Sequence, residues 1–155
     1  MDKINRKFLL IGVIIVLMMG IIMAFEQKGP EHPIVPATQN IVFTGGKWKD
    51  IIAKAKKNGK YIFVDAYTSW CGPCRELKEV TFKNMDAAAY YNGNFINYTV
   101  DMEKGEGVEL AEKWDITAYP TLLFFTPDGN MVMKQIGYVD GKRLIEFGKQ
   151  ALYRK

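Results

Sequence analysis

Apolar and polar positions alternate with different periods along residues 40–155 of this 155-residue chain. The run Tyr61–Tyr67 is apolar except for one acidic residue, Asp65. Such a run is typical of a strand that is buried on both faces in the centre of a sheet. Shorter apolar runs predict further strands at residues 40–43, 94–101, 121–126 and 131–136.

Between these strands, apolar residues recur at helical spacing. The expected helices are one that carries Trp48, Ile51, Ile52 and Ala55 and stops at Gly59, one from Cys74 to about Asn84, a short piece over 85–91, one around 110–114 and one over 144–152. A turn at 127–130 joins the last two strands as a hairpin. The order βαβαβαββα predicts an α/β sandwich with a mixed sheet.

The first 39 residues follow a different pattern. A basic segment, 1–7, precedes an uncharged apolar stretch, 8–25, and a proline-rich linker, 26–39. As a helix, the apolar stretch would span about 27 Å, close to a hydrocarbon core of about 30 Å, and longer than a cleavable signal needs. We expect a membrane anchor, with a cleaved signal peptide as the second choice. The basic segment predicts that the chain after residue 25 lies outside the cytoplasm.

Residues 40–155 suffice for one domain with its own core. The net charge is +4, and the first 25 residues carry half of it. The remainder is too weakly basic to indicate nucleic-acid binding. The single histidine, His32, lies in the linker, where a catalytic or metal-binding role has little support.

Candidate chemistry is concentrated directly after the central apolar run, in the sequence Trp70-Cys-Gly-Pro-Cys74, which holds the only two cysteines. Two intervening residues on the first turn of a helix bring both sulfurs within bonding distance. A thiol at the helix N-terminus has a lowered pKa, so Cys71 is the expected nucleophile and Cys74 the resolving thiol.

Three other interpretations of the pair carry less weight. A structural zinc site needs four ligands, and the chain offers two cysteines and a distant histidine, so no metal is expected. A purely structural disulfide across so short a loop constrains little of the unfolded chain. Two inert buried thiols fit poorly with a Gly-Pro insert at a helix start.

These features together resemble the thioredoxin superfamily. Val64-Asp65, the cysteine motif, Asp101, Tyr119-Pro120-Thr121 and Gly137 follow in that family's order, so the resemblance covers residues 40–155. It implies a three-layer thioredoxin-like sandwich. The segment after the cysteines looks more like extracytoplasmic members, including the C-terminal domain of the transmembrane disulfide reductant.

The resemblance assigns roles to further residues. It implies a cis Pro120 facing the disulfide, with the backbone of Tyr119 pairing with an extended substrate; otherwise Pro120 merely opens a strand. Asp65 matches the family's buried carboxylate, which could take the proton of Cys74, or it has only a local hydrogen-bond role. Trp70 borders the substrate groove or is packing alone. Gly72 and Pro73 complete the expected substrate-binding surface.

Two departures from the family pattern limit these expectations. Thioredoxins often carry a lysine near the buried carboxylate on the next strand, whereas residues 97–99 here are Asn-Tyr-Thr. The pKa of Asp65 is therefore expected to be set by other groups than in those thioredoxins. The loop 102–107 also looks longer than in the shortest members and could shape access by the substrate.

The sequence as a whole predicts a membrane-tethered thiol-disulfide oxidoreductase that reduces disulfide-containing proteins and needs no cofactor. With no further cysteines, the pair must be re-reduced by another protein, for which a transmembrane electron carrier is the expected kind. Two alternatives stay open: a thiol oxidase or isomerase of the same fold, and a non-catalytic binding module.

Overall fold

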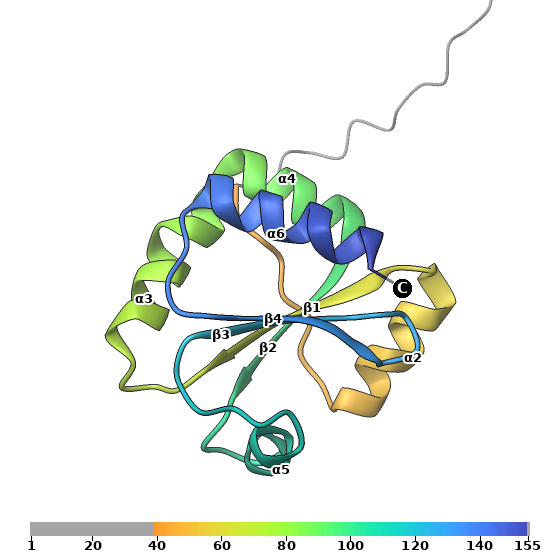
Figure 1. Ribbon diagram of the computed structural model, residues 1–155, viewed down its shortest axis with the longest axis vertical. Coiled ribbons are helices and arrows are strands. Elements are labelled where there is room, and N and C mark those ends of the chain that lie inside the picture. The colour runs from red at the N-terminus through yellow and green to blue at the C-terminus, as the bar shows by residue number, and fades with distance from the viewer. Residues whose placement is uncertain (1–38, 155) are drawn as a thin grey trace, which may run out of the picture. The chain divides into compact units, whose positions relative to one another are not determined.

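The structure is a computed structural model that describes residues 39–154. The predicted segments 1–7 and 8–25, and all but the end of the linker 26–39 with His32, lie outside the described residues. Four strands form a mixed sheet in the order β2-β1-β3-β4, and β1 is parallel to β2 but antiparallel to β3 (Figure 1). The strands are β1 (Tyr61–Tyr67), β2 (Phe95–Asp101), β3 (Thr121–Phe125) and β4 (Met131–Ile136).

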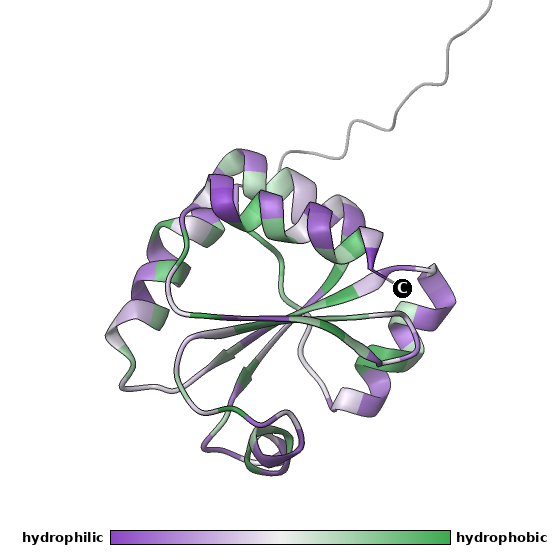
Figure 2. Cartoon of the chain, viewed as in Figure 1, coloured by the Kyte–Doolittle hydropathy of each residue, from purple (hydrophilic) through white to green (hydrophobic). Residues whose placement is uncertain are grey.

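Helices cover both faces of this sheet, which gives the expected three-layer α/β sandwich (Figure 1). On one face lie α3 (Gly72–Glu79), the 3-10 turn η1 (Thr81–Lys83), α4 (Met85–Asn94) and α6 (Gly141–Tyr153). On the other face lie α2 (Trp48–Asn58) and α5 (Glu106–Lys113). The apolar faces of the helices turn towards the sheet, as the colouring in Figure 2 indicates.

Alternation along β1 distributes its side chains between two cores. Phe63 packs in the core under α3, α4 and α6, whereas Ile62, Val64 and Ala66 pack in the core under α2 and α5. Because residues two apart in a strand face the same way, Asp65 shares the face of Phe63 and of α3. The sequence pattern correctly placed β1 in the sheet interior, and its central five residues are buried.

The expected strand at 40–43 was wrong. The segment forms no strand, and only an isolated parallel bridge, between Thr44 and Tyr98, follows it. Its backbone groups find other partners, since the Ile41 N–H donates to the Phe82 carbonyl and the Val42 N–H donates to the Asn92 side chain. These partners lie off the sheet, so no ladder propagates along the segment.

The helix expected from Cys74 to about Asn84 is also interrupted. α3 ends at Glu79, and Val80 stands 56% exposed before η1 begins. The turn buries Phe82, and the Thr81 hydroxyl donates to the Val139 carbonyl at 2.7 Å. Burial of these two residues explains why the straight helix stops one turn early.

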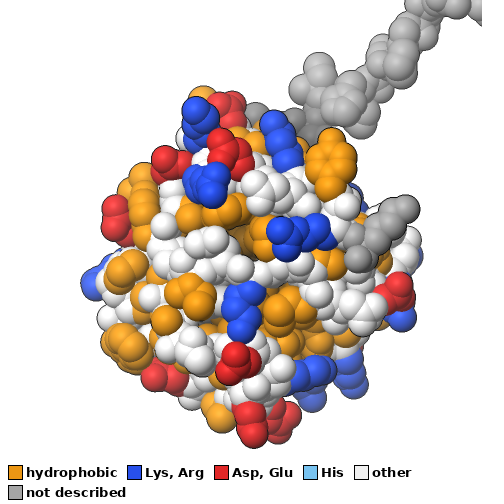
Figure 3. Space-filling model, viewed as in Figure 1, with side chains coloured by type: hydrophobic (Ala, Val, Ile, Leu, Met, Phe, Trp, Pro, Cys, Tyr) orange, Lys and Arg blue, Asp and Glu red, His pale blue; other side chains and the backbone are white. Residues whose placement is uncertain are grey.

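Acidic and basic side chains are interspersed over the face of the molecule drawn in Figure 3. Within residues 39–154, the structure contains no helix with the length and apolar character needed to cross a membrane.

Candidate redox site

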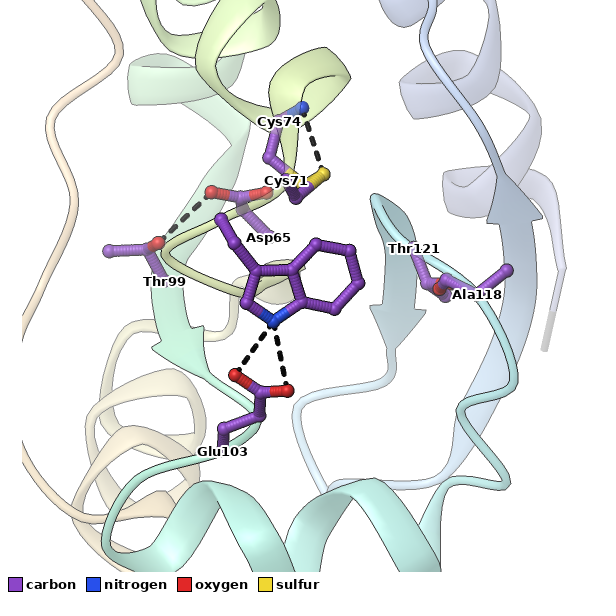
Figure 4. The surroundings of a disulfide bond; sticks show 8 residues. Asp65, Cys71, Cys74, Thr99, Glu103, Ala118 and Thr121 are labelled. Carbon is purple, nitrogen blue, oxygen red and sulfur yellow. Dashed lines mark hydrogen bonds between the residues drawn. A yellow bond between two sulfur atoms is a disulfide. The ribbon is translucent and has the colours of Figure 1, made fainter.

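The cysteine pair lies where β1 ends and α3 begins. Both sulfurs are buried, and they are joined in a disulfide between residues whose Cα atoms are 5.3 Å apart (Figure 4). Pro73 occupies the first turn of α3, where its missing N–H leaves no helical hydrogen bond unmade. Gly72 and Pro73 are both exposed at this turn.

Cys71 occupies the N-cap position of α3. Its sulfur accepts a hydrogen bond from the backbone N–H of Cys74 at 3.1 Å. This is the place at which a helix offers unpaired N–H donors and the positive end of its dipole. Such surroundings stabilise a thiolate on Cys71 when the pair is reduced. Cys71 is 4% exposed and Cys74 is 1% exposed, so the difference in access between them is small.

Asp65 lies in the sheet behind the pair and is fully buried. The Thr99 hydroxyl on neighbouring β2 donates to one carboxylate oxygen at 3.0 Å, while the other oxygen, Oδ1, has no hydrogen-bond partner among the described residues (Figure 4). Burial raises the pKa of the Asp65 carboxyl to about 6, and the positive charge of Lys78 and the Thr99 hydrogen bond oppose part of that rise. A group with this pKa can exchange protons near neutral pH.

The peptide bond between Tyr119 and Pro120 is cis, which confirms the isomer that the family resemblance implied. Thr121 supports the turn, because its hydroxyl donates to the Ala118 carbonyl at 2.7 Å (Figure 4). The Pro120 carbonyl accepts from the Gly137 N–H at 2.8 Å. Tyr119 is partly exposed and is left at the surface before β3 begins.

Trp70 is 66% exposed beside the disulfide. Its indole N–H donates to both carboxylate oxygens of Glu103, at 3.0 and 2.9 Å (Figure 4). The ring also meets Tyr119 edge to face, with centroids 5.9 Å apart. Contacts on two sides fix an exposed aromatic ring between the cysteine turn and the cis-proline turn. The Trp70 ring therefore lies at the surface, outside both cores.

Sequence patterns did not single out Glu103, Thr68 or Lys78. Glu103 comes from the loop after β2 and meets Trp70 only in the folded chain. Thr68 and Lys78, together with the cysteines, line a hollow of about 110 Å³ beside the disulfide. The sequence contains one indication for Lys78. It follows Cys74 by four residues, a spacing that puts both residues on one side of α3.

Among residues 39–154, no group of three or more His, Cys, Asp or Glu side chains is placed to hold a metal ion.

Comparison with known proteins extends this description. The family described as thioredoxin-like domain matches residues 48–152. Thioredoxin H4-1 from Oryza sativa is 31% identical over 121 residues, which cover 77% of this chain and 87% of that protein. A solved structure from Bacteroides thetaiotaomicron, provisionally assigned as a disulphide-isomerase, is 40% identical, with a TM-score of 0.67 and coverage of 75% of this chain and 96% of its own.

The thiol:disulfide interchange protein DsbD of Colwellia psychrerythraea is 32% identical over 90 residues. The match covers 56% of this chain but only 15% of the length of DsbD. The similarity therefore concerns one part of that relative. The family match spans more than half of this chain, and the similarity to thioredoxin H4-1 covers most of that relative, so the chain belongs to the thioredoxin-like domain family.

Proposed function

We propose that the protein is an extracytoplasmic thiol-disulfide oxidoreductase that reduces disulfide bonds in other proteins through Cys71 and Cys74. The observation that carries this proposal is the hydrogen bond from the Cys74 N–H to the Cys71 sulfur at the N-terminus of α3. It supports Cys71 as the attacking thiolate, since a donor aimed at sulfur stabilises the charged form.

The reaction transfers two electrons in two exchanges. The Cys71 thiolate attacks one sulfur of a substrate disulfide, which forms a mixed disulfide and releases the other substrate sulfur as a thiolate. Cys74 then gives its proton to Asp65 and attacks the Cys71 sulfur. The bond between Cys71 and the substrate breaks, its electron pair leaves with the substrate sulfur, and the Cys71–Cys74 disulfide is formed.

The surface around the pair supports a polypeptide as substrate. Trp70 and Tyr119 present aromatic rings that meet edge to face beside the cysteine turn, and the cis Pro120 leads from this surface into β3. In our proposal an extended substrate segment lies along this surface and pairs with the backbone of Tyr119.

The Gly-Pro insert and the similarity to thioredoxins support reduction as the direction. An oxidase or isomerase is the competing function, and the provisional assignment of the Bacteroides structure favours it. The two differ in how strongly the reduced pair is stabilised, which is measured by the reduction potential.

The location and the partners belong to the same proposal. The apolar segment 8–25 anchors the chain, the linker 26–39 carries the domain away from the bilayer, and another protein, for which we propose a transmembrane electron carrier, re-reduces the pair. Similarity to part of DsbD supports the extracytoplasmic location and a separate reductant protein. Sequencing the exported protein tests the anchor, and an N-terminus at or after Phe25 would overturn it.

The reduction potential is the first test of direction. The protein is equilibrated with glutathione at fixed ratios, and the oxidised fraction is measured by thiol alkylation. We expect a potential near about −270 mV, the value of reducing thioredoxins. A value of about −180 mV or above, in the range of isomerases and oxidases, would remove the reductase.

Trapping tests whether the site is catalytic. A Cys74→Ala variant retains the nucleophile but cannot resolve the mixed disulfide, so it should accumulate covalent complexes that a reductant releases. The Cys71→Ser variant is the matched control and should form none. If Cys74→Ala traps nothing while Cys71→Ser keeps every cellular function, the protein is a binding module instead.

A further inference from the structure

Lys78 is a cation held over the sheet face that carries Asp65. It follows Cys74 by four residues on α3, so both residues lie on the same side of the helix. Its Nζ lies 3.0 Å from the centre of the Tyr67 ring. Tyr67 in turn follows Asp65 by two residues on β1, on the same face of the sheet. The aromatic ring therefore holds the ammonium on the Asp65 side of the sheet.

A hollow beside the disulfide lies next to Lys78 and Tyr67. Its walls include Thr68, Cys71, Cys74, Arg75 and Lys78. At about 110 Å³ it is large enough for water. Two polar atoms in this region, Thr68 Oγ1 and Asp65 Oδ1, are buried and have no hydrogen-bond partner among the described residues. Asp65 Oδ1 can therefore accept a proton.

The charges around Asp65 point to Lys78 in particular. The titratable groups near Asp65 are Tyr67 on its own strand, Asp101 on β2 and Lys78 on α3, and the Thr99 hydroxyl adds a hydrogen bond. Asp101 forms an ion pair with Lys104 at 3.0 Å. Among residues 39–154, Lys78 is the cation whose charge lowers the Asp65 pKa, and Asp65 in return raises the Lys78 pKa against a larger opposing effect of burial.

We propose that Lys78 is a positioning residue for proton transfer from Cys74 to Asp65, because its ammonium favours the ionised carboxylate that accepts the proton. The inference rests on the proposed function and deepens it. When Cys74 attacks the mixed disulfide, its proton passes to Asp65 and the negative charge moves from oxygen to sulfur. Lys78 lines the hollow together with Cys74, so its positive charge also lies near the thiolate until the Cys71–Cys74 bond forms, and Asp65 afterwards loses the proton to solvent.

The experiment is a titration of Asp65 in the full-length protein, in both oxidation states. The carbon-13 shift of its carboxyl group is followed from pH 3 to pH 9 in the wild type and in Lys78→Met. We expect the midpoint to rise by about one pH unit, the low end of the range for a nearby opposite charge. The Cys74 step, measured at pH 6 by rapid mixing as the rate at which substrate is released from the mixed disulfide with Cys71, should then slow by about fivefold.

Two further variants separate charge from packing. Lys78→Arg restores the cation and should return both the midpoint and the rate to wild-type values. Lys83→Met removes an exposed lysine that pairs with Glu79, and it should change neither. If Lys78→Met fails to fold, Lys78→Gln, which keeps a polar end, provides the same readout.

The role of Lys78 is overturned if removal of the ammonium leaves the Asp65 midpoint unchanged, or if Lys78→Arg does not restore it. Both outcomes can be told apart from a failure of the proposed function. Failure of Cys74→Ala to trap substrates would overturn the reductase while the titration of Asp65 still reports the charge of Lys78.

Discussion

Asp65 links the folding stability of the protein to pH. Its pKa in the folded state, about 6, lies above its ordinary value of 3.8 because the carboxyl group is buried. Between these two values the folded protein binds more protons at this position than the unfolded chain does. The contribution of Asp65 to stability is therefore most favourable below about pH 4 and declines as pH rises through 6.

Asp65→Asn should remove this dependence. The variant is expected to be more stable than the wild type at pH 8 by up to about 3 kcal/mol, because a difference of about two pKa units corresponds to that free energy. At pH 4 the advantage should largely disappear. Guanidinium unfolding of the oxidised proteins at both pH values measures the difference, and an equal advantage at both would show that charge burial is not its cause.

At the level of residues, the sequence located the groups whose chemistry is local. Cys71 and Cys74 are recognisable by their spacing, and Asp65 by its place in an apolar strand. Glu103 and Lys78 could not be located in this way, because each acquires its role from a partner on another element. Glu103 accepts a hydrogen bond from the indole of Trp70, and the ammonium of Lys78 lies over the ring of Tyr67.

The start of α5 lies unusually close to the end of β2. A Cβ atom on Gly107 would stand 1.9 Å from the Asp101 carbonyl oxygen. The backbone of Asp101 cannot move away from a new Cβ atom as the end of a flexible side chain could. The close approach also fixes the short loop between the two elements, from which Glu103 reaches Trp70.

Gly107→Ala should therefore lower the free energy of unfolding by about 1–3 kcal/mol, the usual range for overpacking. Gly93→Ala is the matched control, since that glycine lies within α4 and a Cβ there would meet no atom within 4 Å. It should raise stability by up to about 1 kcal/mol through better helix propensity. Urea unfolding measures both, and a Gly107→Ala variant as stable as the wild type would contradict the close approach.

Element types were predictable wherever a periodic apolar face meets the sheet, as in α2, β1 and α6. Residues 40–43 have the composition of a strand, but their backbone is paired with Phe82 and with a side chain of α4, which no local pattern reveals. The end of α3 at Val80 was missed for a related reason. Burial of Phe82 in the shared core decides it, and that is a tertiary contact.

On the scale of the whole molecule, both cores are built from residues between Ile41 and Ala151. Residues 35–155 should therefore fold without the preceding part of the chain. A fragment beginning at Val35 is expected to unfold in one cooperative transition, with a urea midpoint equal to that of the full-length protein under the same conditions. A markedly lower midpoint would mean that residues 1–34 contribute to the stability of the domain.

The position of Trp70, whose indole is hydrogen-bonded to Glu103, gives the protein two separate fluorescence signals. The chain has three tryptophans, and Trp48 and Trp114 are buried together with Phe125 on the opposite side of the sheet from α3. Trp70 alone is largely exposed, it is hydrogen-bonded to Glu103 next to the cysteine pair, and disulfides quench the emission of nearby indoles. Reduction should brighten Trp70 and leave the buried pair unchanged, whereas unfolding should alter the emission of all three. The tryptophan fluorescence of one sample would thus report the redox state of the cysteine pair and the unfolding of the domain separately.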